Sequence, residues 1–418
     1  MCLREHYFDP FEPVNQAQRY EQYDLFRSRG PLAWGRPPRP GLNDGIYLFS
    51  HAAVSAALKH RAILQAPEVG AYAARRRTLL TDNVFGLISH AVLFADPPRH
   101  GGLRRPIAAP LARSAAARHA GRMRAHAEVL ARDCNRRGRF DLIKDFATPL
   151  IAGGLLELLG LDVADVSALK RHTSALAADL DLMKDRPRHS PHRSAYAELT
   201  AIVERSLADG PPPRASLAAH LADQVDNGHW RREDLVANLV FLLLAGQETA
   251  VDALGNAVLA LSRHPGAWRA VDDGRVSGPE AVDELLRYDA SLQMSGFRLS
   301  CEHMELCGAS IPAGTPVIAV LGSANRDPTV FRDPERLSLE RRPRNVSRTF
   351  GYGIHNCAGQ HLARYELAAA LETLAAWLPE WHIDEAGVTE RRTVSFRGHV
   401  SVPVVVRPGV GSAESPRR

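Results

Sequence analysis

The sequence predicts a mainly α-helical protein with small β-sheets, folded as one large domain over residues 1–418. Long Ala/Leu/Arg segments carry apolar residues at helical spacing. Strand-like runs are few and lie in the last third of the chain. The Pro/Gly-rich stretches are short, and none separates two independent halves. These three observations outweigh the length, since 418 residues would otherwise suggest two or three domains.

The elements follow in chain order. Helices are expected over 111–132, 142–159, 163–183, 231–263 and 362–378. Pro149 should kink the second helix or mark its start. Strands are expected over 304–307, 316–320 and 400–406. Residues 1–8 and 408–418 are expected to be flexible tails.

Composition excludes several classes of protein. The chain is 45% hydrophobic and 24% charged, which is ordinary for a globular domain and unlike a disordered or collagen-like chain. Its net charge of +5 is too small to indicate nucleic acid. The five cysteines form no regular framework, which favours a reducing compartment. The N-terminus lacks a signal-peptide core, and the longest apolar run, 235–245, is too short to span a bilayer. We therefore expect a soluble, cytoplasmic protein without a membrane partner.

The most informative segment is 350–359, Phe-Gly-Tyr-Gly-Ile-His-Asn-Cys-Ala-Gly. Its glycines allow a tight turn and close backbone approach. Cys357 directly precedes a helical segment, whose N-terminal N–H groups and dipole can stabilise a thiolate. A thiolate on a glycine-rich loop beside His355 suits ligation of a haem iron. A structural cysteine in a turn is the alternative, but it leaves the combination of glycines, histidine and helix unexplained.

With these residues the sequence resembles the cytochrome P450 family. The haem-binding signature is matched at Phe350, Gly353, His355, Cys357 and Gly359. Four further segments resemble family motifs in the right order: 96–104 (Asp-Pro-Pro-Arg-His, then Arg104), 245–249 (Ala-Gly-Gln-Glu-Thr), 284–287 (Glu-Leu-Leu-Arg), and 325–328 (Asn-Arg-Asp-Pro) with 334–336 (Pro-Glu-Arg). The resemblance runs from about residue 9 to 407 and implies the P450 fold, a triangular helical prism that encloses haem.

The resemblance implies haem b as the cofactor and Cys357 as the iron ligand. Phe350 would shield the thiolate, and Gly353 and Gly359 would let the backbone approach sulfur and haem. Four basic residues occupy positions that bind the haem propionates in the family: His100, Arg104, Arg298 and His355. Any one arginine among the 48 of this chain, taken singly, is better explained as a solvated surface group, and it is the position within the motifs that favours propionate binding for these four.

The 245–249 motif implies an oxygen-activation site, with O2 as co-substrate. Ala245 and Thr249 are four residues apart and so share a helix face. By resemblance, they flank the oxygen-binding groove, where Thr249 would hydrogen-bond bound oxygen and Glu248 would help to deliver protons. From the residues alone, Glu248 could mark the return of the helix to solvent, and Thr249 could bond to a preceding carbonyl.

Glu284 and Arg287 are spaced for pairing on one helix face. The resemblance adds Arg336 and buries this triad beneath the cysteine loop, as structural support for the haem-binding core. The alternative is an exposed pair worth a few tenths of a kcal/mol. Cys301, His303 and Cys307 do not match a zinc-site spacing, and no metal is assigned to them.

The substrate pocket is assigned by resemblance to four stretches of chain, and its lining is mostly apolar. For His399 a surface position at a strand turn is equally well supported. The assigned residues are Val84, Phe85, Leu87, Phe241, Leu244, Leu292, Met294, Ser295, His399 and Val400.

The chain leaves no room for a fused reductase, so the expected electron donors are a separate ferredoxin and ferredoxin reductase. A basic docking patch is expected around the cysteine loop, from Arg105, Arg113, Arg341, Arg342, Arg344, Arg348 and Arg364. Residues 185–193 are expected to form a loop above the active site that gates substrate entry.

The sequence thus indicates a haem-thiolate monooxygenase, expected to be monomeric, that hydroxylates a small apolar metabolite, expected to belong to secondary metabolism. Desaturation, C–C cleavage, phenol coupling and epoxidation use the same machinery and stay open. A peroxide-using variant is disfavoured by Glu248 and Thr249, and a non-catalytic haem-binding or sensing protein is the alternative from a different class. Substrate identity and regiochemistry do not follow from the sequence.

Overall fold

The computed structural model describes residues 7–38, 42–65, 89–163, 165–181, 192–210, 212–342, 346–378 and 380–407. The helices of these ranges are α1 (Pro13–Ala17), α2 (Arg19–Arg29), α3 (His51–Lys59), α6 (Arg99–Ala108), α7 (Arg113–Arg137), α8 (Thr148–Leu159), α9 (Val166–Leu180), α10 (His192–Ala208), α11 (Leu217–Asp226), α12 (Arg232–Ser262), α13 (Pro265–Asp272), α14 (Gly278–Tyr288), α15 (Leu321–Ala324) and α16 (Gln360–Trp377).

Four small sheets accompany the helices in the described ranges. The largest has the order β1-β2-β8-β5-β3, from β1 (Leu32–Gly35), β2 (Gly45–Leu48), β3 (Ile63–Leu64), β5 (Arg298–Ser300) and β8 (Pro316–Ala319). The second, β4-β12-β9, combines β4 (Arg139–Asp141), β12 (Pro403–Arg407) and β9 (Glu380–Ile383). Two pairs complete the set: β6 (Met304–Leu306) with β7 (Ala309–Ile311), and β10 (Thr389–Glu390) with β11 (His399–Ser401). The prediction of a mainly helical fold with small sheets is confirmed.

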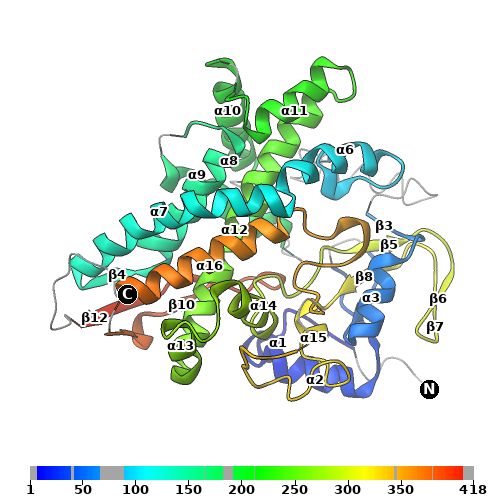
Figure 1. The fold of residues 1–418 in the computed structure, drawn as a ribbon. Coiled ribbons are helices and arrows are strands. Elements are labelled where there is room, and N and C mark those ends of the chain that lie inside the picture. The colour runs from blue at the N-terminus through cyan, green and yellow to red at the C-terminus, as the bar shows by residue number, and fades with distance from the viewer. Residues whose placement is uncertain are drawn as a thin grey trace.

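The helices and strands separate in space. In Figure 1, α7 and α16 lie side by side across the molecule, and the largest sheet lies at the opposite side with α3. α12 passes behind α16 and packs on α8, α9, α10 and α14. The central helix predicted over 231–263 is therefore present and in the core.

The apolar side chains of α12 are mostly buried inside the protein. Within the described ranges it is the one helix long and apolar enough to cross a membrane, and 72% of its most apolar window is buried. A helix apolar on most faces is expected to be buried in this way.

The placement of the strands was predicted incorrectly. Strands were expected only in the last third, yet β1, β2, β3 and β4 lie in the first 141 residues. All four residues of β2 are buried, and β2 pairs in parallel with β8, aligning Ile46 with Val317. A short strand buried on both faces lacks polar alternation, which is the signal that identifies strands in a sequence.

Two details concern the ends of elements. Pro149 stands in the first turn of α8, directly after a π-helical turn over Leu142–Ala147, so it marks a helix start. Phe8 was expected in a flexible tail, but its side chain is fully buried and its N–H bonds to Trp34 O at 2.9 Å. Its ring contacts Phe26, Tyr47 and Phe49, since an aromatic side chain gains most from burial.

Candidate active site

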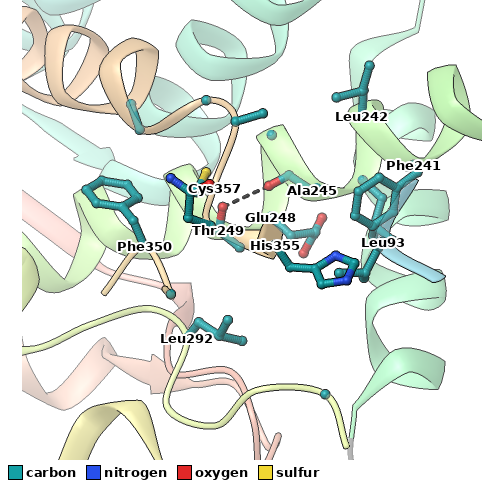
Figure 2. A pocket seen from close by; sticks show the side chains of 18 of the residues that line it. Leu93, Phe241, Leu242, Ala245, Glu248, Thr249, Leu292, Phe350, His355 and Cys357 are labelled. Atoms are coloured by element: carbon teal, nitrogen blue, oxygen red, sulfur yellow. Dashed lines mark hydrogen bonds between the residues drawn. The ribbon is translucent and has the colours of Figure 1, made fainter. Parts of the chain in front are cut away.

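A largely apolar cavity of about 440 Å³ lies between α12, the cysteine loop and the segment 291–299. Its volume falls within the range of small-molecule sites, roughly 300–1,000 Å³. Cys357 and His355 reach it from the loop, Ala245 and Thr249 reach it from α12, and His100 and Arg104 reach it from α6. Figure 2 shows the first four of these side chains together with Phe350, Leu292 and Phe241.

The cysteine loop is held in shape by backbone bonds. Cys357 N–H donates to Phe350 O at 2.8 Å, and Asn356 N–H donates to Gly353 O at 3.1 Å. Gly353 has φ +77°, and a Cβ there would collide with the carbonyl oxygen of Leu58 in α3. Gly353 is therefore required for packing on α3, and its predicted role in the approach of the backbone to sulfur and haem stays a prediction. A Cβ on Gly359, in contrast, would meet open space within the cavity lining.

The Cys357 thiol is surrounded by protein, yet its side chain is exposed to the cavity that it lines. Burial raises its pKa, opposed by a hydrogen bond from the Gly359 backbone and by the charges of Arg104 and Arg364. The start of α16 therefore does not by itself make Cys357 a thiolate. A coordinated metal ion would, because it deprotonates a bound thiol outright.

Four basic groups cluster at one side of the cavity. The His100 and His355 rings are 4.4 Å apart, and Arg104 Nη2 donates to Asn356 Oδ1 at 3.1 Å. Burial and the neighbouring Arg298, His100 and Arg104 charges lower the pKa of His355 to about 3. Burial likewise lowers the pKa of Arg298 to about 10, partly offset by Asp96. Mutual repulsion of this kind is relieved by a bound anion.

Two of these groups also have buried polar atoms without a partner. His100 Nε2 and Arg298 Nε make no hydrogen bond to any described residue. Unpaired buried donors are costly unless a ligand satisfies them. A cavity with a thiol on its lining and unpaired basic groups at one side fits a metal-bearing macrocycle with two carboxylates, which is what haem is.

In the α12 part of the site, the Thr249 hydroxyl bonds to a backbone carbonyl of its own helix. Thr249 Oγ1 donates to Ala245 O at 2.8 Å, which is the dashed line of Figure 2. The hydroxyl proton of Thr249 is therefore used within the helix, and it becomes available to the cavity only when another acceptor replaces Ala245 O. Both residues line the cavity, so the predicted shared face is confirmed.

Glu248 belongs to the cavity lining, but its carboxylate is bonded away from it. Its oxygens accept from Lys170 Nζ at 2.7 Å, Thr173 Oγ1 at 2.7 Å and Arg391 Nη1 at 2.7 Å, and Ser174 Oγ donates at 3.1 Å. Burial alone would raise the pKa of Glu248, yet the two cations and these hydrogen bonds leave it below its ordinary value. Glu248 is thus a buried, ionised carboxylate held by α9 and the C-terminal segment.

Sequence reasoning missed a second carboxyl group of the cavity. Glu366 on α16 lines it, and burial raises the pKa of Glu366 to about 8. Its Oε1 lies 3.8 Å from Nε2 of the buried His119 on α7. An acid nine residues after Cys357 on an otherwise apolar helix face was the available signal.

The structure places some of the predicted pocket residues in the cavity lining, and others lie outside the described residues. Phe241, Leu244, Leu292, Met294 and Ser295 line the cavity. Val84, Phe85 and Leu87 lie outside the described residues, as do most of residues 185–193. The described lining also includes Leu93, Phe94, Leu180, Leu242, Ser395 and Phe396, which were not predicted.

His399 and Val400 were predicted incorrectly as pocket residues. His399 is buried beside Gly255 of α12, outside the described lining, and Val400 is 51% exposed. The C-terminal segment lines the cavity earlier, at Ser395 and Phe396, and Phe396 bridges to Leu292. By residue 399 it has passed beneath α12 into β11.

The predicted triad has the wrong third member. Glu284 pairs with Arg287 at 2.7 Å, and the second arginine is Arg341, whose Nε lies 3.0 Å from Glu284 Oε1. Arg336 is exposed and offers only its carbonyl oxygen, to Arg287 and Arg341. A turn in which Arg336 N–H bonds to Asp333 O points its side chain outward.

The triad supports the cysteine loop through Asn325. Arg287 Nη1 donates to Asn325 O at 3.0 Å, Arg348 N–H donates to Asn325 Oδ1 at 2.6 Å, and Asn325 Nδ2 donates to Thr349 Oγ1 at 3.0 Å. Phe350 follows directly in the chain. The triad is therefore connected to the loop that carries Cys357.

Comparison with known proteins identifies the family. The Cytochrome P450 family profile matches residues 279–375. The chain is 31% identical over 409 residues to the 20-oxo-5-O-mycaminosyltylactone 23-monooxygenase of Streptomyces fradiae, covering 94% of this chain and 90% of that one. It is 34% identical over 259 residues to putative cytochrome P450 133B2 of Xylella fastidiosa, an alignment that spans 60% of this chain and 64% of the relative.

Solved structures agree. Myxobacterial cytochrome P450 CYP267B1 in complex with myristic acid superposes with a TM-score of 0.86 at 31% identity, covering 96% of this chain and 99% of that one. CalO2 superposes with a TM-score of 0.85 at 29% identity, covering 96% and 99%. The chain belongs to the cytochrome P450 family, a family of monooxygenases, and has the fold of its bacterial members.

Proposed function

We propose that the chain is a haem-thiolate monooxygenase that uses O2 and electrons from a separate ferredoxin and ferredoxin reductase to oxidise, by default hydroxylate, an apolar metabolite. The observation that carries this is the content of one cavity: the Cys357 thiol, the Thr249 groove of α12 and a cluster of basic groups line the same apolar chamber. Family membership implies the haem-thiolate class.

Cys357 would hold the haem iron, and His100, Arg104, Arg298 and His355 would hold the propionates. The haem supplies oxygen activation when it is bound, with the thiolate donating electron density that favours O–O cleavage. Gly359 leaves open space on the cavity lining. The ring of Phe350 lies under the guanidinium of Arg364, whose Cζ is 4.5 Å from the ring centre. These residues fix the position and the charge balance of the site.

Thr249 and Glu248 would handle the protons. Thr249 Oγ1, now donating to Ala245 O, can accept or donate within the groove when a polar ligand enters. Glu248 is the neighbouring buried carboxylate, and its position lets it exchange a proton with that groove once its bonds to Lys170 and Arg391 loosen. An acid–alcohol pair of this kind favours O2 use over a peroxide-driven reaction.

The substrate class follows from the lining. Apolar side chains dominate it, with a few polar points such as Ser291, Ser295 and Ser395. Relatives in the comparison include a mycinamicin IV hydroxylase/epoxidase from Micromonospora griseorubida, at 28% identity over 95% of this chain. We therefore propose a secondary metabolite as substrate. Epoxidation, desaturation, C–C cleavage or phenol coupling would use the same cavity.

The electron donor would dock at the cysteine-loop face, but the patch is smaller than predicted. Arg341 is tied to Glu284, Arg364 is tied to Asp283 at 2.7 Å, and Arg348 bonds to Ser55 and lies over Tyr352. Arg344 lies outside the described residues. Arg105, Arg113 and Arg342 remain exposed near this face, and Ile354 of the loop is 48% exposed. An apolar residue bordered by cations suits an acidic redox protein.

A charge-reversal experiment tests this docking face. Arg105→Glu with Arg113→Glu should slow electron transfer from ferredoxin several-fold at low salt and flatten its salt dependence. Arg29→Glu on α2, far from this face in Figure 1, is the matched control. Unchanged rates in the double variant would place the donor elsewhere.

We further propose that the protein acts in the cytoplasm. The four cysteines within the described ranges, Cys134, Cys301, Cys307 and Cys357, are all free, which suits a reducing compartment.

The principal test is the reduced carbon-monoxide spectrum of the haem-loaded protein. A thiolate-type Soret shift is expected, and Cys357→Ser should abolish it while Cys307→Ser, in the exposed β6–β7 turn, should retain it. A wild-type spectrum without that shift would overturn the assignment. The protein is then incubated with ferredoxin, reductase and a range of apolar metabolites. A normal spectrum combined with no oxygenated product would favour the non-catalytic binding or sensing alternative.

A further inference from the structure

A second buried acid lies one helical turn beyond Glu248. Asp252 of α12 is fully buried, and neither of its carboxylate oxygens has a hydrogen-bond partner among the described residues. Within the described ranges its one ion-pair contact is Arg391 Nη2, 3.3 Å from Oδ1. Buried carboxylates are normally satisfied, so this one calls for an explanation.

Arg391 serves both acids, unequally. Its Nη1 is 2.7 Å from Glu248 Oε2, with hydrogen-bond geometry, while its Nη2 is only a longer contact to Asp252. Glu248 has further donors in Lys170, Thr173 and Ser174. One guanidinium therefore stands between a well-satisfied carboxylate and an unsatisfied one.

Asp252 has no room to move away. Gly398 packs against its carboxyl group so closely that a Cβ there would collide with Asp252 Cγ and Oδ1. The charged groups that act on it are Arg391 and Lys170, which favour ionisation, and Glu248, which opposes it. Burial outweighs the two cations and raises the pKa of Asp252 to about 7. His399 stands next to Gly398 and is itself buried, with both ring nitrogens unpartnered in the described part of the chain.

We propose that Asp252 is a positioning residue for Glu248, and that it acts by competing with Glu248 for Arg391. When Asp252 is protonated, Arg391 is held by Glu248 alone and the bonds around Glu248 are at their strongest. When Asp252 is ionised, Arg391 is shared and a second negative charge stands one turn away. Both changes make it easier for Glu248 to leave Arg391 and to accept a proton.

This inference rests on the proposed function only for its role in turnover, because the competition itself is a property of the protein chain. The primary test is therefore a pH titration of protonated carboxyl groups by infrared difference spectroscopy, on the haem-loaded resting protein. A band titrating near pH 7 is expected in the wild type and should be missing in Asp252→Asn. Asp273→Asn changes an exposed acid directly after α13; it is the matched control and should leave the band in place.

Two further variants test the competition. Glu248→Gln should lower the titration midpoint of Asp252, because Arg391 becomes fully available to it and a like charge is removed. Arg391→Gln should raise that midpoint, since its largest opposing charge is lost. A midpoint that stays within about 0.3 pH units in Glu248→Gln would show that the two acids do not compete, and the proposal would fail.

Turnover then tests the positioning role. NADPH oxidation with spinach ferredoxin, its reductase and myristic acid as probe should rise with pH through the Asp252 midpoint in the wild type. In Asp252→Asn this rise should be missing, with a roughly three- to tenfold lower rate at pH 8, less than the ~10²-fold loss expected on removing a general acid itself. Identical pH profiles would overturn the role in turnover. A protein that shows the titration but forms no oxygenated product with any of the apolar metabolites tested above would count against the proposed function and leave the competition standing.

Discussion

Two buried carboxylate–arginine clusters of this protein differ in how completely they are satisfied. In the first, Glu284 accepts from Arg287, Ser338 and Arg341, and Arg287 also donates to the carbonyls of Asn325, Pro334 and Arg336. In the second, Arg391 stands between Glu248 and Asp252, and the oxygens of Asp252 have no hydrogen-bond partner in the described structure.

Because of this difference, the Glu284 cluster supports the fold, whereas the arrangement of the Glu248 cluster can change. Every donor and acceptor of the Glu284 cluster has one arrangement of lowest energy, so it fixes the polypeptide around the cysteine loop. The second cluster has two cations, Lys170 and Arg391, for its two acids, but both cations bond to Glu248 and leave Asp252 without a hydrogen bond in the described structure, so its arrangement depends on protonation. Four predictions test this contrast, from the largest expected effect to the smallest.

Glu284→Gln should be the most damaging change. It leaves the buried Arg287 and the partly buried Arg341 without a carboxylate, and breaking a buried ion pair such as Glu284–Arg287 costs about 3–5 kcal/mol. Urea unfolding measures the loss, and the reduced carbon-monoxide spectrum should show incomplete haem incorporation. A variant as stable as the wild type would contradict the view that this cluster supports the fold.

Asp252→Asn should change the pH dependence of stability. The folded-state pKa of Asp252 is raised to about 7 from 3.8, so the folded protein retains a proton that the unfolded chain has lost. This contribution to stability is present at low pH and is lost as pH rises from about 4 through 7, at up to about 1.4 kcal/mol per pH unit. The variant should therefore gain relative to the wild type as pH rises, measured by urea unfolding at pH 5, 6, 7 and 8. A constant difference across that series would mean that Asp252 does not titrate there.

Arg391→Gln should cost less than Glu284→Gln, roughly 1–3 kcal/mol. Glu248 keeps Lys170, Thr173 and Ser174, and Asp252 can become neutral by retaining its proton. Urea unfolding of the two variants side by side gives the ranking. The reverse order would remove the distinction between the two clusters.

Arg336→Ala should change stability by less than about 0.5 kcal/mol, because its side chain is exposed and only its carbonyl takes part in the Glu284 cluster. Arg341→Ala is the matched comparison and should cost several times more, since its guanidinium bonds to Glu284. Equal effects would restore Arg336 to the triad.

Much of the site could be predicted because its chemistry lies in short, contiguous motifs. The order of glycine, histidine and cysteine in 350–359 indicated a haem-thiolate loop, and the four-residue spacing of Ala245 and Thr249 indicated a shared face. Arg341 was missed because choosing between it and Arg336 depends on a turn at Asp333, which has φ +47°. Asp252 was missed because an acid on a long helix reveals neither its burial nor its neighbours.

The sequence by itself determined the helical class, the central helix and the cysteine loop, since helix periodicity and glycine spacing are local properties of the chain. Only the tertiary structure decided which acids are buried, which arginine reaches each of them, and where the C-terminal segment enters the cavity. Phe396 lines the cavity and His399, three residues on, does not, because that choice depends on where the chain passes beneath α12. Pairing of buried charges depends on contacts between residues far apart in the chain, such as Arg391 and Glu248, and no local pattern encodes them.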